Sequence, residues 1–238
     1  MLFRSAAIHD PDRRAPGVLQ TSIAADVANA ACSGRIPNSE DARRIVYEKG
    51  RALLARRDLQ GAKHQFELAI SGGYRAALVD LADLLADATA GMPDSGRALT
   101  LYERAWQDGV PLAAFKVGQL LEHGVPSEAW MWYQKGADAG EPNALARFAE
   151  RDERDALAQT DLFKRNGELL QALRFYAAAA ERAREEDWPD EAWKNWRYRR
   201  ASLARVLAQR GMMQQVADAY SATLEKRDLR STGVVAAN

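Results

Sequence analysis

Residues that could do chemistry are few and scattered in this sequence. The three histidines, His9, His64 and His123, do not pair with one another at helical spacing, and the one cysteine, Cys32, has no evident base near it. A zinc site needs several such ligands at short spacings, and a reactive thiol needs neighbours that lower its pKa. We therefore expect no metal, no cofactor and no catalytic residue.

Two carboxylates, Asp83 and Asp87, lie four residues apart and would share one face of a helix. Such a pair could act as acid and base or bind a hard cation. A solvated acidic helix face is a far more common reason for this spacing. The sequence also contains no phosphate-binding glycine motif of the G-x-x-x-x-G-K-[ST] or G-x-G-x-x-G type. We favour the solvated face and predict that the protein is not an enzyme.

The segment 188–200 interleaves three tryptophans and a tyrosine with basic residues. Such a pattern can stack on nucleic acid or form a protein interface. It can also be a packed stripe, because Trp193, Trp196 and Arg200 share one helix face. The charge balance, 33 basic against 33 acidic residues with a pI near 6.9, argues against nucleic acid as the main partner. Core packing is favoured, and the two binding alternatives stay open.

The elements that must position any site are predicted to be helices. Across 238 residues alanine is abundant and proline is rare, which favours an all-α chain. Arginine outnumbers lysine by 26 to 7, and together with the alanine content this indicates a GC-rich bacterial genome. No apolar run reaches the roughly 18 residues of a membrane helix.

A ladder of small, aromatic, small and glycine residues recurs three times along the chain. Its spacing of four and then three places the side chains on one helix face, and its last glycine suits the left-handed position after a helix end. The three ladders are Ala62-Phe66-Ala69-Gly73, Ala98-Tyr102-Ala105-Gly109 and Ala129-Tyr133-Gly136-Gly140.

Each ladder follows a second helical stretch, so the pattern predicts pairs of antiparallel helices. Two later units carry a modified ladder in which Gly167 and Gly211 are expected in the turn between the two helices of a pair. Longer linkers are expected at 150–156 and 185–191. The predicted helical-repeat domain spans 41–226, and its units cover about 42–74, 75–110, 111–141, 153–184 and 192–226. An N-terminal arm at 1–40, with a short capping helix at 18–31, is expected before it. A flexible tail at 227–238 is expected after it.

Residues 75–145 resemble the Sel-one-like repeat family, a variant of the tetratricopeptide repeat. The best match is Ala113–Gly124 followed by Ala129–Gly140, which is similar to the family strings A-x-x-x-L-G-x-x-Y-x-x-G and A-x-x-W-Y-x-K-A-A-x-x-G. Residues 155–224 resemble ordinary tetratricopeptide repeats. The resemblance implies a right-handed α-solenoid of about five antiparallel helix pairs, with a concave groove that binds another protein.

The resemblance also implies which positions face the groove, because the first helix of each pair lines it. Such a groove would be basic at both ends and acidic in the middle, and it would suit a peptide or loop of mixed charge. The residues implied are Arg44, Tyr47, Arg51, Val79, Asp83, Asp87, Phe115, Gln119, Glu122, His123, Arg154, Asp161, Lys164, Arg165, Tyr198, Arg205 and Gln209.

The function predicted is a non-catalytic scaffold or adaptor that binds a protein partner in its groove. The alternatives are a dedicated immunity protein or chaperone for a secreted effector, and nucleic-acid binding through 188–200. Polar residues interrupt the N-terminal stretch where a signal peptide would be apolar, so we expect the cytoplasm, with export by an atypical signal as the alternative. Whether the arm occupies the groove, and the oligomeric state, are left open.

Overall fold

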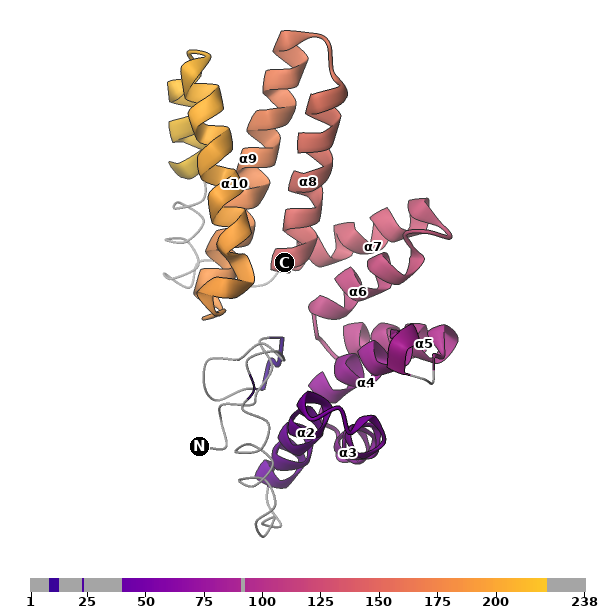
Figure 1. The fold of residues 1–238 in the computed structure, drawn as a ribbon. Coiled ribbons are helices and arrows are strands. Elements are labelled where there is room, and N and C mark those ends of the chain that lie inside the picture. The colour runs from indigo at the N-terminus through magenta and orange to yellow at the C-terminus, as the bar shows by residue number, and fades with distance from the viewer. Residues whose placement is uncertain (1–8, 13–22, 24–39, 91–92, 222–238) are drawn as a thin grey trace. The chain divides into compact units, whose positions relative to one another are not determined.

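The computed structural model describes residues 9–12, 23, 40–90 and 93–221, and all regular structure within them is helical. The all-α prediction is confirmed. The chain divides into two compact units (Figure 1): unit 1 comprises Met1–Ala139 and Asp187–Pro189, and unit 2 comprises Gly140–Glu186 and Asp190–Asn238. The predicted capping helix, Cys32 and the C-terminal tail lie outside the described residues, as does most of the arm.

Unit 1 is a short α-solenoid of three antiparallel helix pairs. The pairs are α2 (Glu40–Ala55) with α3 (Leu59–Ser71), α4 (Ala76–Ala86) with α5 (Ser95–Gln107), and α6 (Leu112–Leu121) with α7 (Pro126–Asp138); a single 3-10 turn, η3 (Ala88–Ala90), follows α4. Each helix packs against the next one in the chain, and α4 also contacts α6 directly. The first helices of the pairs therefore form a continuous surface, which we call the inner face and define as the exposed side of α2, α4 and α6.

The ladder predicted from the sequence forms the core of these pairs. Its small and aromatic members are buried in α3, α5 and α7. Gly73, Gly109 and Gly140 all have a positive φ, of 82°, 80° and 78°, which confirms the predicted role of glycine after each helix. The ladder thus determines both the buried face of each second helix and the residue at which the chain turns.

Gly118 of α6 shows why small residues recur on the first helices. A Cβ atom at this position would lie 2.4 Å from Cε1 of Tyr133, the aromatic ladder residue of α7. The tyrosine ring therefore packs directly against the backbone of the partner helix. A glycine permits this close approach, and any larger residue would force the helices or the ring to move.

Unit 2 is built from longer helices. The helix α8 (Pro142–Ala158) forms a hairpin with α9 (Leu162–Glu185), and α10 (Asp190–Gln209) packs against α9. A further helical stretch occupies 213–221. The core of unit 2 is a cluster of leucines, alanines and one tyrosine from α8, α9, α10 and that last stretch.

Two predictions about unit 2 are wrong. Gly167 lies inside α9 and not in a turn, and the expected linker at 150–156 is part of α8. The turn instead lies at 159–161, where the Asp161 side chain accepts hydrogen bonds from the backbone N–H groups of Phe163 and Lys164. One internal glycine costs a helix only about 1 kcal/mol, and the capped, well-packed α9 tolerates it. The linker near 185–191 and the turn at Gly211, with φ of 79°, are confirmed.

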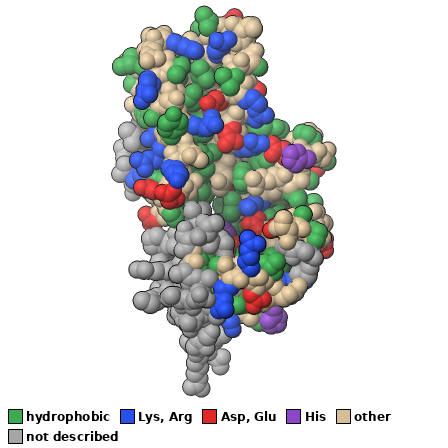
Figure 2. Space-filling view, in the orientation of Figure 1, with side chains coloured by type: hydrophobic (Ala, Val, Ile, Leu, Met, Phe, Trp, Pro, Cys, Tyr) green, Lys and Arg blue, Asp and Glu red, His purple; other side chains and the backbone are tan. Residues whose placement is uncertain are grey.

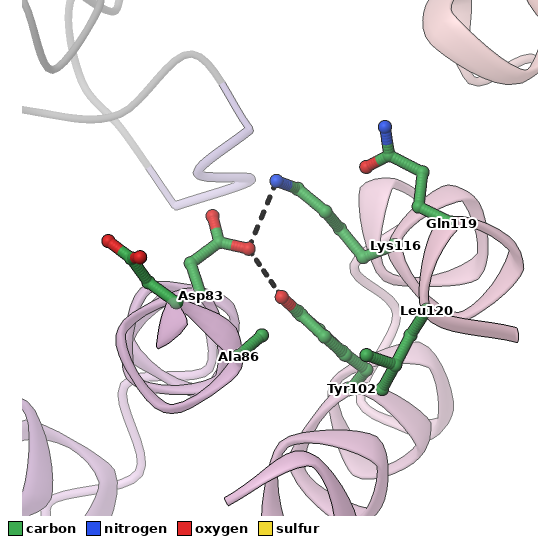
Figure 3. A pocket seen from close by; sticks show the side chains of 7 residues that line it. Asp83, Ala86, Tyr102, Lys116, Gln119 and Leu120 are labelled. Atoms are coloured by element: carbon green, nitrogen blue, oxygen red, sulfur yellow. Dashed lines mark hydrogen bonds and ion pairs between the residues drawn. The ribbon is translucent and has the colours of Figure 1, made fainter. Parts of the chain in front are cut away.

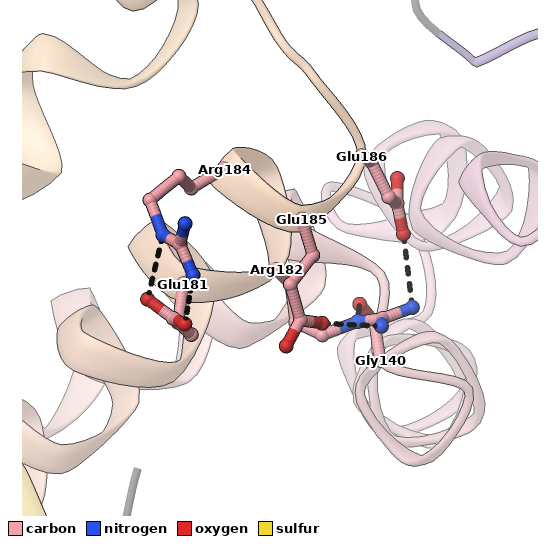
Figure 4. Close-up of polar contacts among 6 residues, drawn as sticks. All are labelled: Gly140, Glu181, Arg182, Arg184, Glu185 and Glu186. Atoms are coloured by element: carbon pink, nitrogen blue, oxygen red, sulfur yellow. Dashed lines mark hydrogen bonds and ion pairs between the residues drawn. The ribbon is translucent and has the colours of Figure 1, made fainter. Parts of the chain in front are cut away.

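Arg182 ties the end of α9 to the start of unit 2 (Figure 4). Its guanidinium donates to the Gly140 carbonyl at 3.2 Å and forms ion pairs at 2.9 Å with Glu185 and with Glu186. Next to Gly140, the buried Glu141 carboxylate caps α8 by accepting from the Ala144 N–H at 2.6 Å. Burial raises the pKa of Glu141 to about 7.

Candidate functional site

Four of the predicted groove residues are buried, which corrects the prediction that they contact a partner. Arg44, Tyr47 and Arg51 of α2 and Val79 of α4 have relative exposures of 6% or less. Tyr47 and Val79 belong to the hydrophobic core shared by the helix pairs of unit 1, so these two positions are interior. Tyr47 illustrates this, because its hydroxyl donates to Asp80 of α4 at 2.6 Å.

Three other predicted residues meet on the inner face of unit 1 (Figure 3). Asp83, Asp87 and Gln119 line one open pocket of about 430 Å³. Asp83 lies on α4, Asp87 is the residue directly after that helix, and Gln119 lies on α6. The pocket is completed by Ala86, Tyr102, Lys116 and Leu120.

Asp83 is the centre of this pocket. It accepts a hydrogen bond from the Tyr102 hydroxyl at 2.5 Å and forms an ion pair with Lys116 at 3.0 Å. Burial, followed by the charge of Asp83, raises the pKa of Tyr102, so the phenol stays protonated and acts as a donor. Asp87 is exposed, and hydrogen bonds from Thr89 lower its pKa. The pocket therefore presents one solvated carboxylate beside one carboxylate that already has two partners.

The remaining predicted residues of unit 1 lie outside this pocket. Glu122 accepts a hydrogen bond from the Tyr133 hydroxyl at 3.0 Å, and the half-buried Phe115 ring lies 5.7 Å from the Tyr133 ring. His123 is exposed just beyond the end of α6. Glu122 and Phe115 therefore support the α6–α7 pair, and His123 stands apart from the other candidates.

In unit 2, two of the predicted residues have structural roles in the turn between α8 and α9. Asp161 caps α9, and Arg165 donates through Nε to the Gln159 carbonyl at 2.8 Å. The other five are exposed on α8, α9 and α10: Arg154, Lys164, Tyr198, Arg205 and Gln209.

Sequence reasoning missed Tyr102 and Lys116 as lining residues of the pocket. Tyr102 was recognised as a ladder residue but interpreted only as packing. The choice of tyrosine over phenylalanine was the available signal, because a buried phenol needs a hydrogen-bond partner. Lys116 carried no such signal, since its contact with Asp83 joins residues of two different pairs.

The same contact recurs along the chain. The ladder tyrosine of a second helix donates to a carboxylate on the first helix in three pairs, Tyr102 to Asp83, Tyr133 to Glu122 and Tyr176 to Glu153. The ladder tyrosines of both units thus donate to a carboxylate of their own pair, although the carboxylates occupy different positions along the first helices or directly after them. The chain is a helical-repeat protein.

Three solved structures that are similar to this helical-repeat protein are distant from it in sequence. Over 79% of this chain and 91% of its own length, a Sel1 repeat protein from Oxalobacter formigenes is 17% identical, with a TM-score of 0.44. A protective antigen of uropathogenic Escherichia coli strains that displays an SLR fold is 17% identical over 71% of this chain, with a TM-score of 0.43, and this chain spans only 40% of that antigen. An immunity protein from Pseudomonas aeruginosa is 16% identical over 84% and 87% of the two chains, with a TM-score of 0.34. No protein-family model matches the sequence, and no curated protein matches it.

The aromatic and basic segment at 188–200 belongs mainly to α10. Trp193 is buried, and Trp196 packs against the core of unit 2. Arg197 lies over the Trp193 ring at 5.1 Å, and Arg200 lies over the Tyr220 ring at 5.2 Å. Figure 2 shows basic and acidic side chains interspersed over the visible face. These contacts favour the packing interpretation of this segment.

Two kinds of feature are absent from the part of the chain that the structure describes. No group of three or more His, Cys, Asp or Glu side chains there is arranged to hold a metal ion. None of the helices there has both the length and the apolar character needed to cross a bilayer.

Proposed function

We propose that this protein is a non-catalytic adaptor or scaffold, and that the inner-face pocket of unit 1 binds a segment of a partner protein. The observation that carries the proposal is the open pocket of about 430 Å³ around Asp83. Protein-binding surfaces commonly combine an apolar floor with a few polar groups of fixed position. Here Ala86 and Leu120 supply the apolar part, and Asp87 and Gln119 supply exposed polar groups.

The chemistry of the pocket suits a peptide or loop of mixed charge. Asp87 can accept from a basic side chain or a backbone N–H, and the Gln119 amide can both donate and accept. Lys116 can shift from Asp83 toward an acidic group of the partner, because an ion pair at this exposure contributes little to stability. Tyr102 and Asp83 hold α5 against α4, which favours a binding role for this pocket over catalysis.

Site-specific photo-cross-linking tests the proposal. A benzoylphenylalanine at Gln119 should capture a discrete partner from a lysate of the source organism, and the same group at Gln107 on the exposed face of α5 should not. The double variant D87K/Q119R should abolish co-purification of that partner, while the matched variant D138K/Q107R, exposed elsewhere on unit 1, should retain it. Equal capture at both positions, or equal loss in both double variants, would exclude this pocket as the binding site.

The alternatives make distinct predictions. An immunity protein or chaperone would use the same face and would yield a single secreted effector in the cross-linking experiment; that role stays a prediction. Nucleic-acid binding through 188–200 is disfavoured, because Trp193 and Trp196 pack in unit 2 and do not form an open stacking platform. Labelled oligonucleotides should therefore keep their mobility at low salt when the protein is added.

A further inference from the structure

The inner face of unit 1 already holds a short piece of polypeptide, the turn His9–Asp12. The Tyr74 hydroxyl, just before α4, donates to Asp10 at 2.5 Å. Arg75 at the start of α4 binds Asp12 with two hydrogen bonds, of 3.0 Å from Nε and 2.8 Å from Nη2. His9 Nε2 lies 3.8 Å from the Asp80 carboxylate in the middle of α4. Three of the four residues are therefore anchored to one helix and the turn before it.

The fit is close and the charges are complementary. Asp10 is fully buried and the His9 side chain is 9% exposed. A buried carboxylate is costly unless donors surround it, and here the Tyr74 hydroxyl provides one donor and the Asp12 backbone N–H, at 2.9 Å, provides another. The Arg75 contact lowers the pKa of Asp12. Tyr74 and Arg75, directly before the first residue of α4, thus bind two carboxylates spaced two residues apart.

The turn lies close to the pocket described above. His9 is near enough to Asp83 and Lys116, two residues of the pocket, for their charges to act on its imidazole. A segment that fills the pocket and continues along α4 would meet His9 first. Two anchored carboxylates and one imidazole contact oppose the entropy of ordering the segment, so we expect docking to be reversible.

We propose that His9–Asp12 is an intramolecular ligand of the inner face, and that the partner displaces it with a segment of the same pattern: an aromatic or imidazole side chain followed by carboxylates one and three residues later. The proposal rests on the proposed function, since it describes the partner and the regulation of that surface. The turn would then hold the surface closed until a competing acidic segment replaces it.

The groups around His9 give the docking a dependence on pH. Arg51 of α2, Asp80 and Asp83 of α4, Lys116 of α6 and the adjacent Asp10 all face the imidazole. Burial, followed by the charge of Arg51, lowers the pKa of His9 from 6.5 to about 4. The docked turn therefore prefers neutral histidine, and docking weakens as pH falls from 6.5 toward 4. For His9 alone, this pKa shift predicts that the turn binds about tenfold more weakly at pH 5.5 than at pH 7.5.

Two carboxylates oppose the histidine effect. Burial raises the pKa of Asp10 and of Asp80, which strengthens docking as pH falls. The contribution of the histidine must therefore be isolated by substitution.

The test uses a fluorescent peptide of residues 5–16 and the full chain. The variant D10A/D12A, with its own turn released, should bind the peptide at least tenfold more tightly than the unsubstituted chain, whose turn competes. A peptide with the same two substitutions should not bind. Adding Y74F to the released chain should weaken binding of the unsubstituted peptide about tenfold, through loss of one charge-assisted hydrogen bond. The affinity of the unsubstituted peptide relative to that of a peptide carrying H9Q should fall about tenfold between pH 7.5 and pH 5.5, because this ratio isolates the contribution of His9.

Several results would overturn the inference. These are equal binding of the peptide to both chains, no binding to the released chain, or a dimer formed by docking of the turn into a second copy, which size-exclusion chromatography would detect. Because the peptide is the protein's own, this experiment does not depend on a partner being found. Peptide binding without any cross-linked partner would count against the proposed function alone, and a partner that binds both chains equally would count against the intramolecular ligand alone.

Discussion

The two units contain the same three-part contact in different settings. In unit 1, Asp83 joins Tyr102 of its own pair to Lys116 of the next pair. In unit 2, Glu153 of α8 accepts from Tyr176 of α9 at 3.1 Å and pairs with Arg199 of α10 at 2.6 Å. Each carboxylate therefore connects a ladder tyrosine to a cation on the following helix.

The settings differ because the helices differ in length. In unit 1, α4 and α6 have 11 and 10 residues, and α4 ends three residues after Asp83, where Asp87 adopts an extended conformation. Tyr176 and Arg199 instead lie in the middle of helices of 24 and 20 residues. The tyrosine–carboxylate contact thus holds a helix pair together in both units, and in unit 1 the pocket lies where α4 ends beside this contact.

The largest expected effect is the pH dependence of the stability of unit 2. Glu141 of unit 2 has a pKa of about 7, raised from 4.5 mainly by burial. The folded state keeps a proton that the unfolded chain has lost, so the stability of unit 2 should fall as pH rises from 4.5 to 7, by about 3 kcal/mol in total. The variant E141Q, which retains a capping oxygen, should remove this slope. Hydrogen exchange resolved by unit measures it, and an unchanged slope in E141Q would show that another group is responsible.

The substitution G118A should disrupt the close packing of α6 against α7 in unit 1. The added methyl group would meet the Tyr133 ring at 2.4 Å. Overpacking should destabilise unit 1 by about 2 kcal/mol even after the better helix propensity of alanine. Faster exchange of the α6 and α7 amides, with unit 2 unchanged, is the expected readout. No loss of protection would mean that the ring moves aside freely.

Removing the hydroxyls of the ladder tyrosines tests whether the tyrosine–carboxylate contact contributes equally to the stability of the two units. Y102F and Y176F should each destabilise their own unit by about 1 kcal/mol, since each removes a hydrogen bond to a carboxylate. Phenylalanine fits this position, because Phe66 occupies it in the first pair. Chemical denaturation followed by hydrogen exchange compares the two. A clear loss in only one unit would show that the contact stabilises the two pairs differently.

The smallest expected effect is a gain in the stability of unit 2. Gly167 lies within α9, and a Cβ atom there would meet no atom within 4 Å. G167A should therefore stabilise unit 2 by about 0.5–1 kcal/mol through helix propensity alone. G118A and G167A thus form a matched pair, because the same change from glycine to alanine should destabilise unit 1 and stabilise unit 2. Destabilisation by G167A would indicate that the glycine has a role that the structure does not show.

The sequence by itself determined the helical class, the ladder and its buried aromatic residues, and the glycines that turn the chain at 73, 109, 140 and 211. These are local properties, because periodicity and a positive φ depend on residues a few positions apart. The family resemblance implied that Asp83, Asp87 and Gln119 face the groove, and the structure brings these three residues together in one pocket.

Only the tertiary structure decided which of these residues are accessible and what completes the pocket. Packing between helices determines that Arg51 and Val79 are buried. It also lets α9 continue through Gly167, because packing outweighs local helix propensity. The contact of Lys116 with Asp83 and the docking of Asp10 on Tyr74 join residues 33 and 64 positions apart. No repeat spacing specifies such pairs, because they form only when separate helix pairs, or the chain's own first residues, meet on one surface.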